Sequence, residues 1–237
     1  MRVLLTRPER DSRRFAEQFA TPGIETLFEP MLTIEYEVSP LDLSSYQAIL
    51  LTSRYGARGL ARATEQRGVP ILTVGSATAA TAEEEGFTRV RSARGDAAVL
   101  AQFTKSVLDS GDGPVLFVHG QDTTGDLKSA LETAGFAVDE SVLYAAHAAE
   151  KLSSETVSAL DEGSVDGVLL FSPRTARTFV SLVAMAGLSH RTVNIDAYCL
   201  SDAVAEAALG LAWRRILVAS RPEADALIAL LSGPGIA

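Results

Sequence analysis

The 237-residue sequence has few cysteines and histidines and no long apolar run, which limits disulfides, metal sites and membrane spans. It has one cysteine, Cys199, so no internal disulfide can form. Its three histidines are scattered at no metal-ligand spacing, and we expect no metal site. No apolar run approaches the roughly 18–20 residues of a membrane helix, and the run Val3–Leu5 is too short for a signal-peptide core. We therefore expect a soluble, cytoplasmic protein.

Positive charge is also scarce. Lysine and arginine number 21 against 30 acidic residues, which gives a net charge of −9. A basic surface supplies most of the affinity for nucleic acids and anionic membranes, so we expect neither as a partner. An anionic small molecule remains compatible with this charge, because backbone amides and a few arginines can bind it locally.

Three common catalytic and nucleotide-binding motifs are missing. No G-x-x-x-x-G-K-[ST] loop occurs, and V-G-S-A-T-A at Val74 lacks the second and third glycines of a dinucleotide fingerprint. The G-x-S-x-G motif of serine hydrolases is absent as well. The sequence therefore gives little support to ATP binding, nicotinamide binding or serine hydrolysis.

Short apolar runs alternate with helix-length amphipathic segments, and 47% of the residues are apolar, enough for a packed core. This alternation predicts parallel sheets covered by helices. Helices are predicted at Glu9–Ala20, Ala79–Glu85 and Gly125–Ala134, and residues 232–237 are predicted to be a loose tail. The predicted strands are Val3–Leu5, Glu25–Phe28, Ala48–Leu51, Ile71–Val74, Arg89–Arg91, Val115–Val118, Val138–Val142, Gly167–Phe171, Asp196–Leu200 and Arg215–Val218.

A weak internal repeat divides the chain. Four segments of one half find a counterpart, in the same order, in the other half. The pairs are V-L-L-T-R-P at Val3 with V-L-F-V-H-G at Val115, L-T-S at Leu51 with L-F-S at Leu170, L-T-V-G-S-A-T-A at Leu72 with Y-C-L-S-D-A-V-A at Tyr198, and R-G-D-A-A-V-L at Arg94 with R-P-E-A-D-A-L at Arg221. The repeat predicts two related α/β halves.

Small hydroxyl residues and glycines recur where a predicted strand ends and a helix begins. In open α/β sheets, ligands bind at these carboxyl ends, and a helix N-terminus suits a carboxylate or phosphate. Each hydroxyl can equally be an ordinary helix N-cap, and for a single junction both interpretations stay open. The candidate binding residues are Thr6, Arg7, Thr52, Ser53, Gly75, Ser76, Thr78, Gly120, Ser172 and Ser201.

Two segments interrupt the strand–helix alternation, Met31–Val38 and Leu143–Glu150, and both are predicted to be extended connectors. Tyr144 lies in the second, where its phenol could donate a proton to a leaving hydroxyl group. A half-buried tyrosine that only packs is the alternative, and Tyr36 in the first connector has the same two interpretations. Five basic residues lie at helix starts, and each is expected to be a solvated surface charge more often than a site residue: Arg7, Arg54, Arg58, Arg174 and Arg177.

Taken in order, these segments resemble the uroporphyrinogen-III synthase family. The matching pieces are V-L-L-T-R-P, A-I-L-L-T-S-R-Y-G-A-R, T-V-G-S-A-T-A-A-T-A-E-E-E-G-F, V-L-F-V-H-G-Q-D-T-T-G-D-L-K-S-A-L-E-T-A-G-F, S-V-L-Y-A and G-V-L-L-F-S-P-R-T-A-R-T-F. They span nearly the whole chain, and their order and spacing carry the resemblance.

The resemblance implies an α/β fold of two flavodoxin-like parallel-sheet domains joined by a two-stranded connector, with the ligand cleft between them. One domain would be discontinuous, residues 1–34 plus 150–237, and the other would be residues 38–144. The connectors would be about residues 31–38 and 143–150.

The resemblance also implies a lyase that cyclises hydroxymethylbilane to uroporphyrinogen III, with loss of water and inversion of ring D through a spiro intermediate. No cofactor or metal is expected, and Tyr144 matches the tyrosine proposed to assist departure of the hydroxyl group. The other candidate residues would bind substrate carboxylates. A monomer is expected, and transient contacts with neighbouring enzymes of tetrapyrrole synthesis would fit this role.

One departure from the family pattern bears on function. Where the family often has I-G-x-x-T-A, this sequence has L-S-D-A-V-A from Leu200, so Val204 replaces the threonine and Ser201 the glycine. A valine cannot donate a hydrogen bond. Because this hydroxyl is missing, an alternative to the synthase stays open: a non-catalytic two-domain protein that binds a tetrapyrrole or another anionic small molecule.

Overall fold

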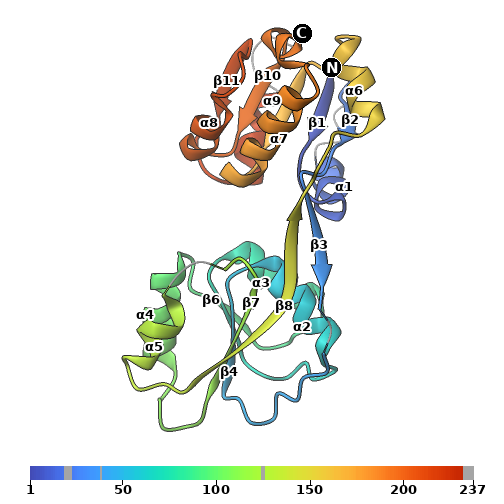
Figure 1. The fold of residues 1–237 in the computed structure, drawn as a ribbon. Helices are drawn as coiled ribbons and strands as arrows, with labels where there is room; N and C mark the ends of the chain where they lie inside the picture. The colour runs from blue at the N-terminus through green and yellow to red at the C-terminus, as the bar shows by residue number, and fades with distance from the viewer. Residues whose placement is uncertain (19–22, 38, 124–125, 232–237) are drawn as a thin grey trace. The chain divides into compact units, whose positions relative to one another are not determined.

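The computed structural model describes residues 1–18, 23–37, 39–123 and 126–231 (Figure 1). The chain forms two units: Met1–Thr33 with His147–Ala237, called the first unit, and Ile34–Ala146, called the second unit. The predicted tail, Val38, Gly125 and the end of the first predicted helix lie outside the described residues. No helix among the described residues is both long and apolar enough to cross a membrane.

The first unit is built on a five-stranded sheet in which every described neighbouring pair is parallel. Its strand order is β11-β10-β9-β1-β2. The strands are β1 (Arg2–Leu5), β2 (Glu25–Phe28), β9 (Gly167–Leu170), β10 (Asp196–Cys199) and β11 (Arg215–Val218). Because helices cover both of its faces, the central strands β9 and β10 are buried at all four positions.

Helices cover both faces of this sheet. The core on one face is formed with α6, α7 and α8, and the core on the other with α1 and α9. Their bounds are α1 (Glu9–Gln18), α6 (Ser154–Asp161), α7 (Pro173–Met185), α8 (Asp202–Ala208) and α9 (Ala224–Leu231), with a 3₁₀ helix, η1, at Ser189–Asn194.

The second unit contains most of a six-stranded sheet with the order β3-β8-β7-β4-β5-β6. The strands are β3 (Leu32–Tyr36), β4 (Ala48–Leu51), β5 (Ile71–Thr73), β6 (Val90–Ser92), β7 (Val115–Gly120) and β8 (Val138–Ala148). Helices α2 (Arg54–Ala63) and α3 (Ser76–Glu84) pack on one face, and α4 (Ala97–Val107) and α5 (Leu127–Glu132) on the other (Figure 1).

Strands β3 and β8 carry the chain from one unit to the other and lie side by side (Figure 1). The Glu37 amide donates to the Leu143 carbonyl at 3.1 Å, and the Ala149 amide donates to the Met31 carbonyl at 3.0 Å. The partners run in opposite directions along the chain, so this pair is antiparallel, whereas its neighbours in the sheet are parallel.

The two sheets confirm the internal repeat. Strand β1 corresponds to β7, β9 to β4 and β10 to β5, as the paired sequence segments predict, and each set occupies the same place in its sheet. The order β2-β1-β9-β10-β11 is the flavodoxin-like order 2-1-3-4-5, and β8-β7-β4-β5-β6 repeats it with the chain entering at β4. The order reverses between β1 and β9 and between β7 and β4, where α/β sheets have their ligand crevices.

Several predicted boundaries change in the structure. The strand predicted at Val138–Val142 and most of the connector predicted at Leu143–Glu150 form one continuous strand, β8. The helix predicted from Ala79 begins three residues earlier at Ser76. The prediction that Arg58 is a solvated charge is wrong: it lies inside α2 and is 3% exposed. A helix start alone does not reveal that this face of α2 packs against the sheet.

Candidate functional site

The candidate residues of the second unit gather at the carboxyl ends of its parallel strands. Thr52 and Ser53 follow β4, Gly75 and Ser76 follow β5, and Gly120 is the last residue of β7. Strands β4 and β7 are hydrogen-bonded neighbours, and they are the pair at which the strand order reverses. The structure therefore brings these predicted residues to one edge of one sheet.

Ser53 is the N-cap of α2 and also contacts the candidate catalytic residue. Its backbone is extended, and its hydroxyl oxygen accepts a hydrogen bond from the Gly56 amide at 3.0 Å. The same oxygen lies 2.8 Å from the phenol oxygen of Tyr144. Ser53 is therefore a helix N-cap, and its hydroxyl also contacts the phenol of the candidate catalytic residue.

Tyr144 reaches Ser53 across an intervening strand. It belongs to β8, whereas Ser53 follows β4, and β7 lies between these two strands. At the end of β7 stands Gly120, where an added Cβ would lie 2.5 Å from two carbon atoms of the Tyr144 ring. Because glycine has no side chain, the ring can lie over the end of β7.

The loop after β7 also holds the backbone of Tyr144. The Gln121 amide donates to the Tyr144 carbonyl at 2.9 Å, next to an irregularity in the β7–β8 pairing between His119 and Gly120. The Thr123 hydroxyl accepts from the Gly120 amide at 3.1 Å. Backbone and ring of Tyr144 are therefore fixed together.

The environment of Tyr144 keeps its phenol protonated. Burial raises its pKa above the usual value of 10, and the negative charges of Tyr36 and Asp122 in their ionised forms act in the same direction. The hydrogen bond with Ser53 lowers the pKa and partly offsets this shift. At neutral pH the phenol is therefore a proton donor, and not a base.

The remaining candidates of the second unit differ in accessibility. Gly75 is the N-cap of α3 and has no side chain to bond the first turn, and Ser76 is exposed. Thr78 is only 5% exposed and faces the interior of the unit. The α3 start therefore offers backbone amides and the Ser76 hydroxyl, while the Thr78 side chain packs.

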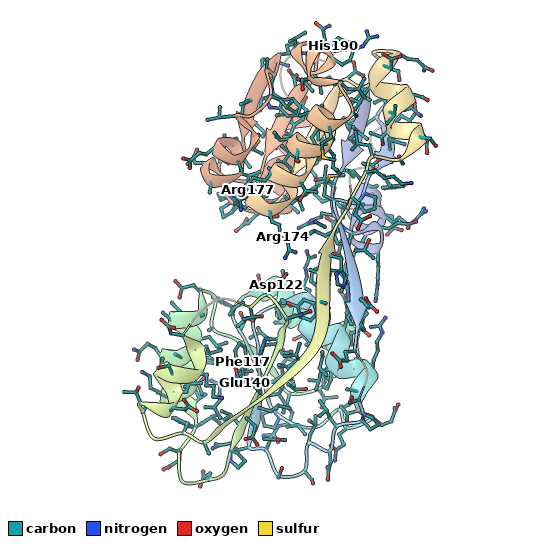
Figure 2. All side chains as sticks on the ribbon, in the orientation of Figure 1. Phe117, Asp122, Glu140, Arg174, Arg177 and His190 are labelled. Atoms are coloured by element: carbon teal, nitrogen blue, oxygen red, sulfur yellow. The ribbon has the colours of Figure 1, made fainter. Side chains whose placement is uncertain are left out.

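A pocket of about 230 Å³ opens beside these residues, on the face of the sheet that α4 and α5 cover. It is lined by Thr52, Val74, Asp96, Ala97, Phe117, Thr123 and Leu127. Figure 2 shows Phe117 and Glu140 on the neighbouring strands β7 and β8, and Asp122 in the loop that follows β7. The His119 ring packs on that of Phe117, with centroids 4.7 Å apart.

An ion pair of Glu140 joins β8 to α5. Its carboxylate lies 2.6 Å from the Lys128 ammonium group and 3.4 Å from His119 Nε2. The hydrogen bond from Lys128 is the main reason that the pKa of Glu140 lies below its usual value. This carboxylate is therefore ionised, and it contacts both Lys128 and His119.

In the first unit, Thr6 and Arg7 follow β1 at the equivalent edge. The Thr6 side chain is fully buried, and its hydroxyl donates to the Leu169 carbonyl at 2.6 Å. The Arg7 guanidinium stacks on the Phe171 ring, 4.1 Å from its centroid. Thr6 thus joins β1 to β9, and Arg7 places a cation at the point where the strand order reverses.

Ser172 follows β9 and starts α7 with a reciprocal capping box. Its hydroxyl accepts from the Thr175 amide at 3.1 Å, and the Thr175 hydroxyl accepts from the Ser172 amide at 3.1 Å. Pro173 occupies the first helical turn. Arg174 and Arg177 extend from the start of α7 (Figure 2), so two further cations accompany this helix N-terminus.

Ser201 is the N-cap of α8, and its side chain makes no capping hydrogen bond. Val204, which replaces the family threonine, is 1% exposed and belongs to the core that α6, α7 and α8 share. Thr78, at the corresponding place in α3, is also buried. The valine therefore removes no hydroxyl from the accessible edge of the sheet.

Gly59, in the middle of α2, also shapes the site and is not among the residues predicted from the sequence. An added Cβ there would be 2.9 Å from the Leu143 Cβ, so this glycine lets α2 approach β8 next to Tyr144. A glycine inside an otherwise helix-forming stretch, A-R-G-L-A-R, was the available signal. Thr123 was missed because an exposed loop threonine has no local pattern that marks it.

No group of three or more His, Cys, Asp and Glu residues that could hold a metal ion is found within the described part of the chain. Cys199 is buried in the first unit, and burial raises the pKa of its thiol to about 11. The thiol is therefore unreactive at neutral pH.

Comparison with known proteins agrees with this architecture. The chain is similar to a uroporphyrinogen-III synthetase from Helicobacter pylori, with a TM-score of 0.67 and 16% identity over 98% of this chain and 99% of that one. It is also similar to a mutant uroporphyrinogen III synthase from the extremely thermophilic bacterium Thermus thermophilus, with a TM-score of 0.54 and 17% identity over 98% of both chains. These two structures support the fold.

The family assignment comes from the sequence as a whole. A family model described as "Uroporphyrinogen-III synthase HemD" matches residues 13–229, which include every described strand except β1 and every candidate residue except Thr6 and Arg7. This match covers far more than half of the 237 residues. The chain therefore belongs to the uroporphyrinogen-III synthase family, a family of lyases.

Proposed function

We propose that this chain closes hydroxymethylbilane to uroporphyrinogen III, with Tyr144 as the acid that assists loss of water. The observation that carries the proposal is the position of the Tyr144 phenol, which lies against Ser53 and Gly120 at the carboxyl edge of the sheet in the second unit, where burial raises its pKa. Membership of the family supplies the substrate and the product.

The reaction requires two things from the protein: a proton donor and a fixed conformation of the substrate. Tyr144 donates its proton to the hydroxyl group of the substrate as that group leaves, which produces water, an N-protonated azafulvene and the Tyr144 phenolate. The substituted α-carbon of ring D then attacks the azafulvene methylene, which gives a spiro intermediate. The original bond from that carbon to the ring C methylene breaks, and the free α-carbon of the inverted ring D bonds to this methylene and loses its proton, which closes the macrocycle. Most of the rate advantage comes from holding a flexible chain in the conformation that permits this attack.

Carboxylates of the substrate bind, in this proposal, at the carboxyl edges of both sheets. In the second unit the donors are the amides of Gly75 and Ser76 and the hydroxyl of Thr52, at or beside the start of a helix. In the first unit they are the Ser172 and Ser201 junctions, with Arg7 supplying positive charge. For Thr6 and Thr78, whose side chains are buried, only the backbone is available.

No observation favours the alternative of a non-catalytic binding protein. The main argument for a binding protein is the missing hydroxyl at residue 204, but the Val204 side chain is buried in the core, away from any ligand edge. The cytoplasmic location, the monomeric state and the transient contacts with neighbouring pathway enzymes belong to the proposal as well. Their support is the acidic composition, the lack of long apolar runs and the nature of the substrate.

The experiment is an isomer assay. Hydroxymethylbilane is supplied to the purified protein, and the products are oxidised and resolved into isomers I and III. Spontaneous closure gives the symmetric isomer I, so the proposal predicts an excess of isomer III that grows with protein concentration. Isomer I alone, together with stabilisation of the protein by tetrapyrrole, would instead support the binding protein.

A further inference from the structure

The hydrogen bond between Ser53 and Tyr144 can run in two directions. The two oxygen atoms are 2.8 Å apart, and either can be the donor. If the phenol donates, its proton is directed at Ser53 and away from a substrate. If Ser53 donates, the phenol keeps its own proton free for another acceptor. The direction therefore decides whether Tyr144 is ready to act as an acid.

The contacts of Ser53 favour donation by the serine. Its oxygen already accepts from the Gly56 amide, at the N-terminus of the ten-residue helix α2. A hydroxyl group that accepts a hydrogen bond becomes a stronger donor, because linked hydrogen bonds polarise one another. The positive end of the helix also favours negative charge on nearby oxygen atoms. Both effects stabilise a phenolate at Tyr144.

Two glycines make this chain of hydrogen bonds possible. A side chain at Gly120 would occupy the place of the Tyr144 ring, and one at Gly59 would push α2 away from Leu143. The Tyr55 ring, in the first turn of α2, packs against Tyr144 with centroids 5.7 Å apart. The start of α2 and residue 144 of β8 are thus held together from several sides.

We propose that Ser53 is a positioning residue that donates its hydroxyl hydrogen to the Tyr144 oxygen and so directs the phenol proton to the substrate. The inference rests on the proposed role of Tyr144 as the acid. It also gives Ser53 a task other than binding a substrate carboxylate.

The proton and the electrons balance along this path. When the carbon–oxygen bond of the hydroxymethyl group breaks, its electron pair stays on the departing oxygen. That oxygen takes the Tyr144 proton and leaves as water, and Ser53 donates to the phenolate that remains. The proton released from the terminal pyrrole carbon on ring closure returns to the phenolate, which restores Tyr144.

The first test measures the pKa of Tyr144 by an NMR titration of protein labelled with ¹³C at the tyrosine Cζ. The chain has five tyrosines, and the signal of residue 144 is the one lost in Tyr144→Phe. Ser53→Gly removes the donor, and glycine is itself well tolerated at a helix N-cap. The pKa should then rise by roughly 0.5 to 1 pH unit, which is the worth of one ordinary hydrogen bond.

Two variants control for folding and capping. Ser53→Thr keeps both the cap and the donor and should leave the Tyr144 pKa in place. Ser153→Gly removes the serine cap of another helix, α6 of the first unit, and should also leave the Tyr144 pKa unchanged. A Tyr144 pKa that is the same in Ser53→Gly as in the unmodified protein would overturn the proposal.

The second test is a double-mutant cycle on turnover. Ser53→Gly should lower kcat about fivefold with KM nearly unchanged, and Ser53→Thr should restore it. In Tyr144→Phe, the further change Ser53→Gly should have no effect, because Ser53 acts through the phenol. Two effects that multiply independently would contradict the inference. Unchanged turnover in Tyr144→Phe alone would instead remove the acid role itself, while the NMR titration still decides on the hydrogen bond.

Discussion

The Ser53 hydroxyl and the Tyr144 phenol lie 2.8 Å apart although 91 residues separate them in the sequence. One follows β4, the other belongs to β8, and the strand between them ends at Gly120. The contact depends on three unrelated local facts: a helix cap, a glycine at the end of a strand and a strand that continues past its neighbours. Their combination places a protonated phenol at the carboxyl edge of a parallel sheet.

Gly120→Ala should displace the Tyr144 ring. The new methyl group would lie 2.5 Å from two ring carbons, so the ring must move, and overpacking of this kind costs about 1–3 kcal/mol. We expect a loss of turnover of about tenfold or more together with a lower Tm, measured by initial rates and thermal unfolding. Gly68→Ala is the matched control, because nothing lies within 4 Å of its added Cβ. Equal rates in the two variants would show that the ring position does not matter.

The Tyr144-dependent part of the rate should resist alkaline pH. Burial holds the pKa of Tyr144 above 10, so the proton to be donated is present at every lower pH and is lost only as the pH rises through that raised value. The ratio of the rates of the unmodified protein and Tyr144→Phe should therefore stay constant from about pH 7 to 9. A ratio that declines within this range would mean that another group with a lower pKa is the acid.

Acid stability should depend on Asp196, which has no part in the proposed site. Its carboxylate is fully buried, and although burial alone would raise the pKa, hydrogen bonds from Arg214 and Arg215 lower it from 3.8 to about 2. Stability from this group is complete above the unfolded value and is lost as the pH falls through the folded one.

The lowered pKa of Asp196 contributes roughly 1–2 kcal/mol to the free energy of unfolding, after allowance for solvent screening around the two arginines. Asp196→Asn should flatten the change in unfolding free energy between about pH 4 and 2, measured by urea unfolding. The exposed pair Asp161–Arg191 offers the control Asp161→Asn, which should leave the slope as it is. If the unfolding free energy of Asp196→Asn changed with pH as steeply as that of the unmodified protein, Asp196 would not be the source of this acid dependence.

Val204→Thr, which restores the family residue, should not raise activity. The side chain is buried between helices and strands of the first unit, so its hydroxyl would not reach a substrate. We expect turnover within about twofold of the unmodified protein and a stability lower by about 1 kcal/mol, from burying a poorly bonded hydroxyl. Steady-state kinetics with urea unfolding measures both, and a large gain in kcat/KM would show that residue 204 does contact substrate.

Local pattern predicted much of the fold. The strands Glu25–Phe28, Ala48–Leu51 and Arg215–Val218 were located to the residue, because each is a short apolar or β-branched run between turn residues. The paired segments also predicted which strands are equivalent in the two sheets. The full length of β8 was not predictable in this way, since its second half is ordered by pairing with the distant strand β3.

The site was predictable in outline but not in its contacts. Strand–helix junctions identify Ser53 and Ser172 as residues at carboxyl edges, and the family resemblance identifies Tyr144. Neither shows that the Ser53 hydroxyl faces Tyr144, nor that Thr6 and Thr78 turn inward. Burial of a side chain depends on helix packing against the sheet, which a hydroxyl residue at a junction does not reveal.

The most direct measurement is the isomer composition formed from hydroxymethylbilane with the protein in excess, compared for the unmodified chain and Tyr144→Phe. The excess of protein keeps spontaneous closure in solution from dominating. The account predicts isomer III from both proteins, with Tyr144→Phe slower by about 10- to 100-fold, because positioning selects the isomer and the phenol only assists departure of water. Isomer I from the unmodified protein, or equal rates from the two proteins, would contradict it.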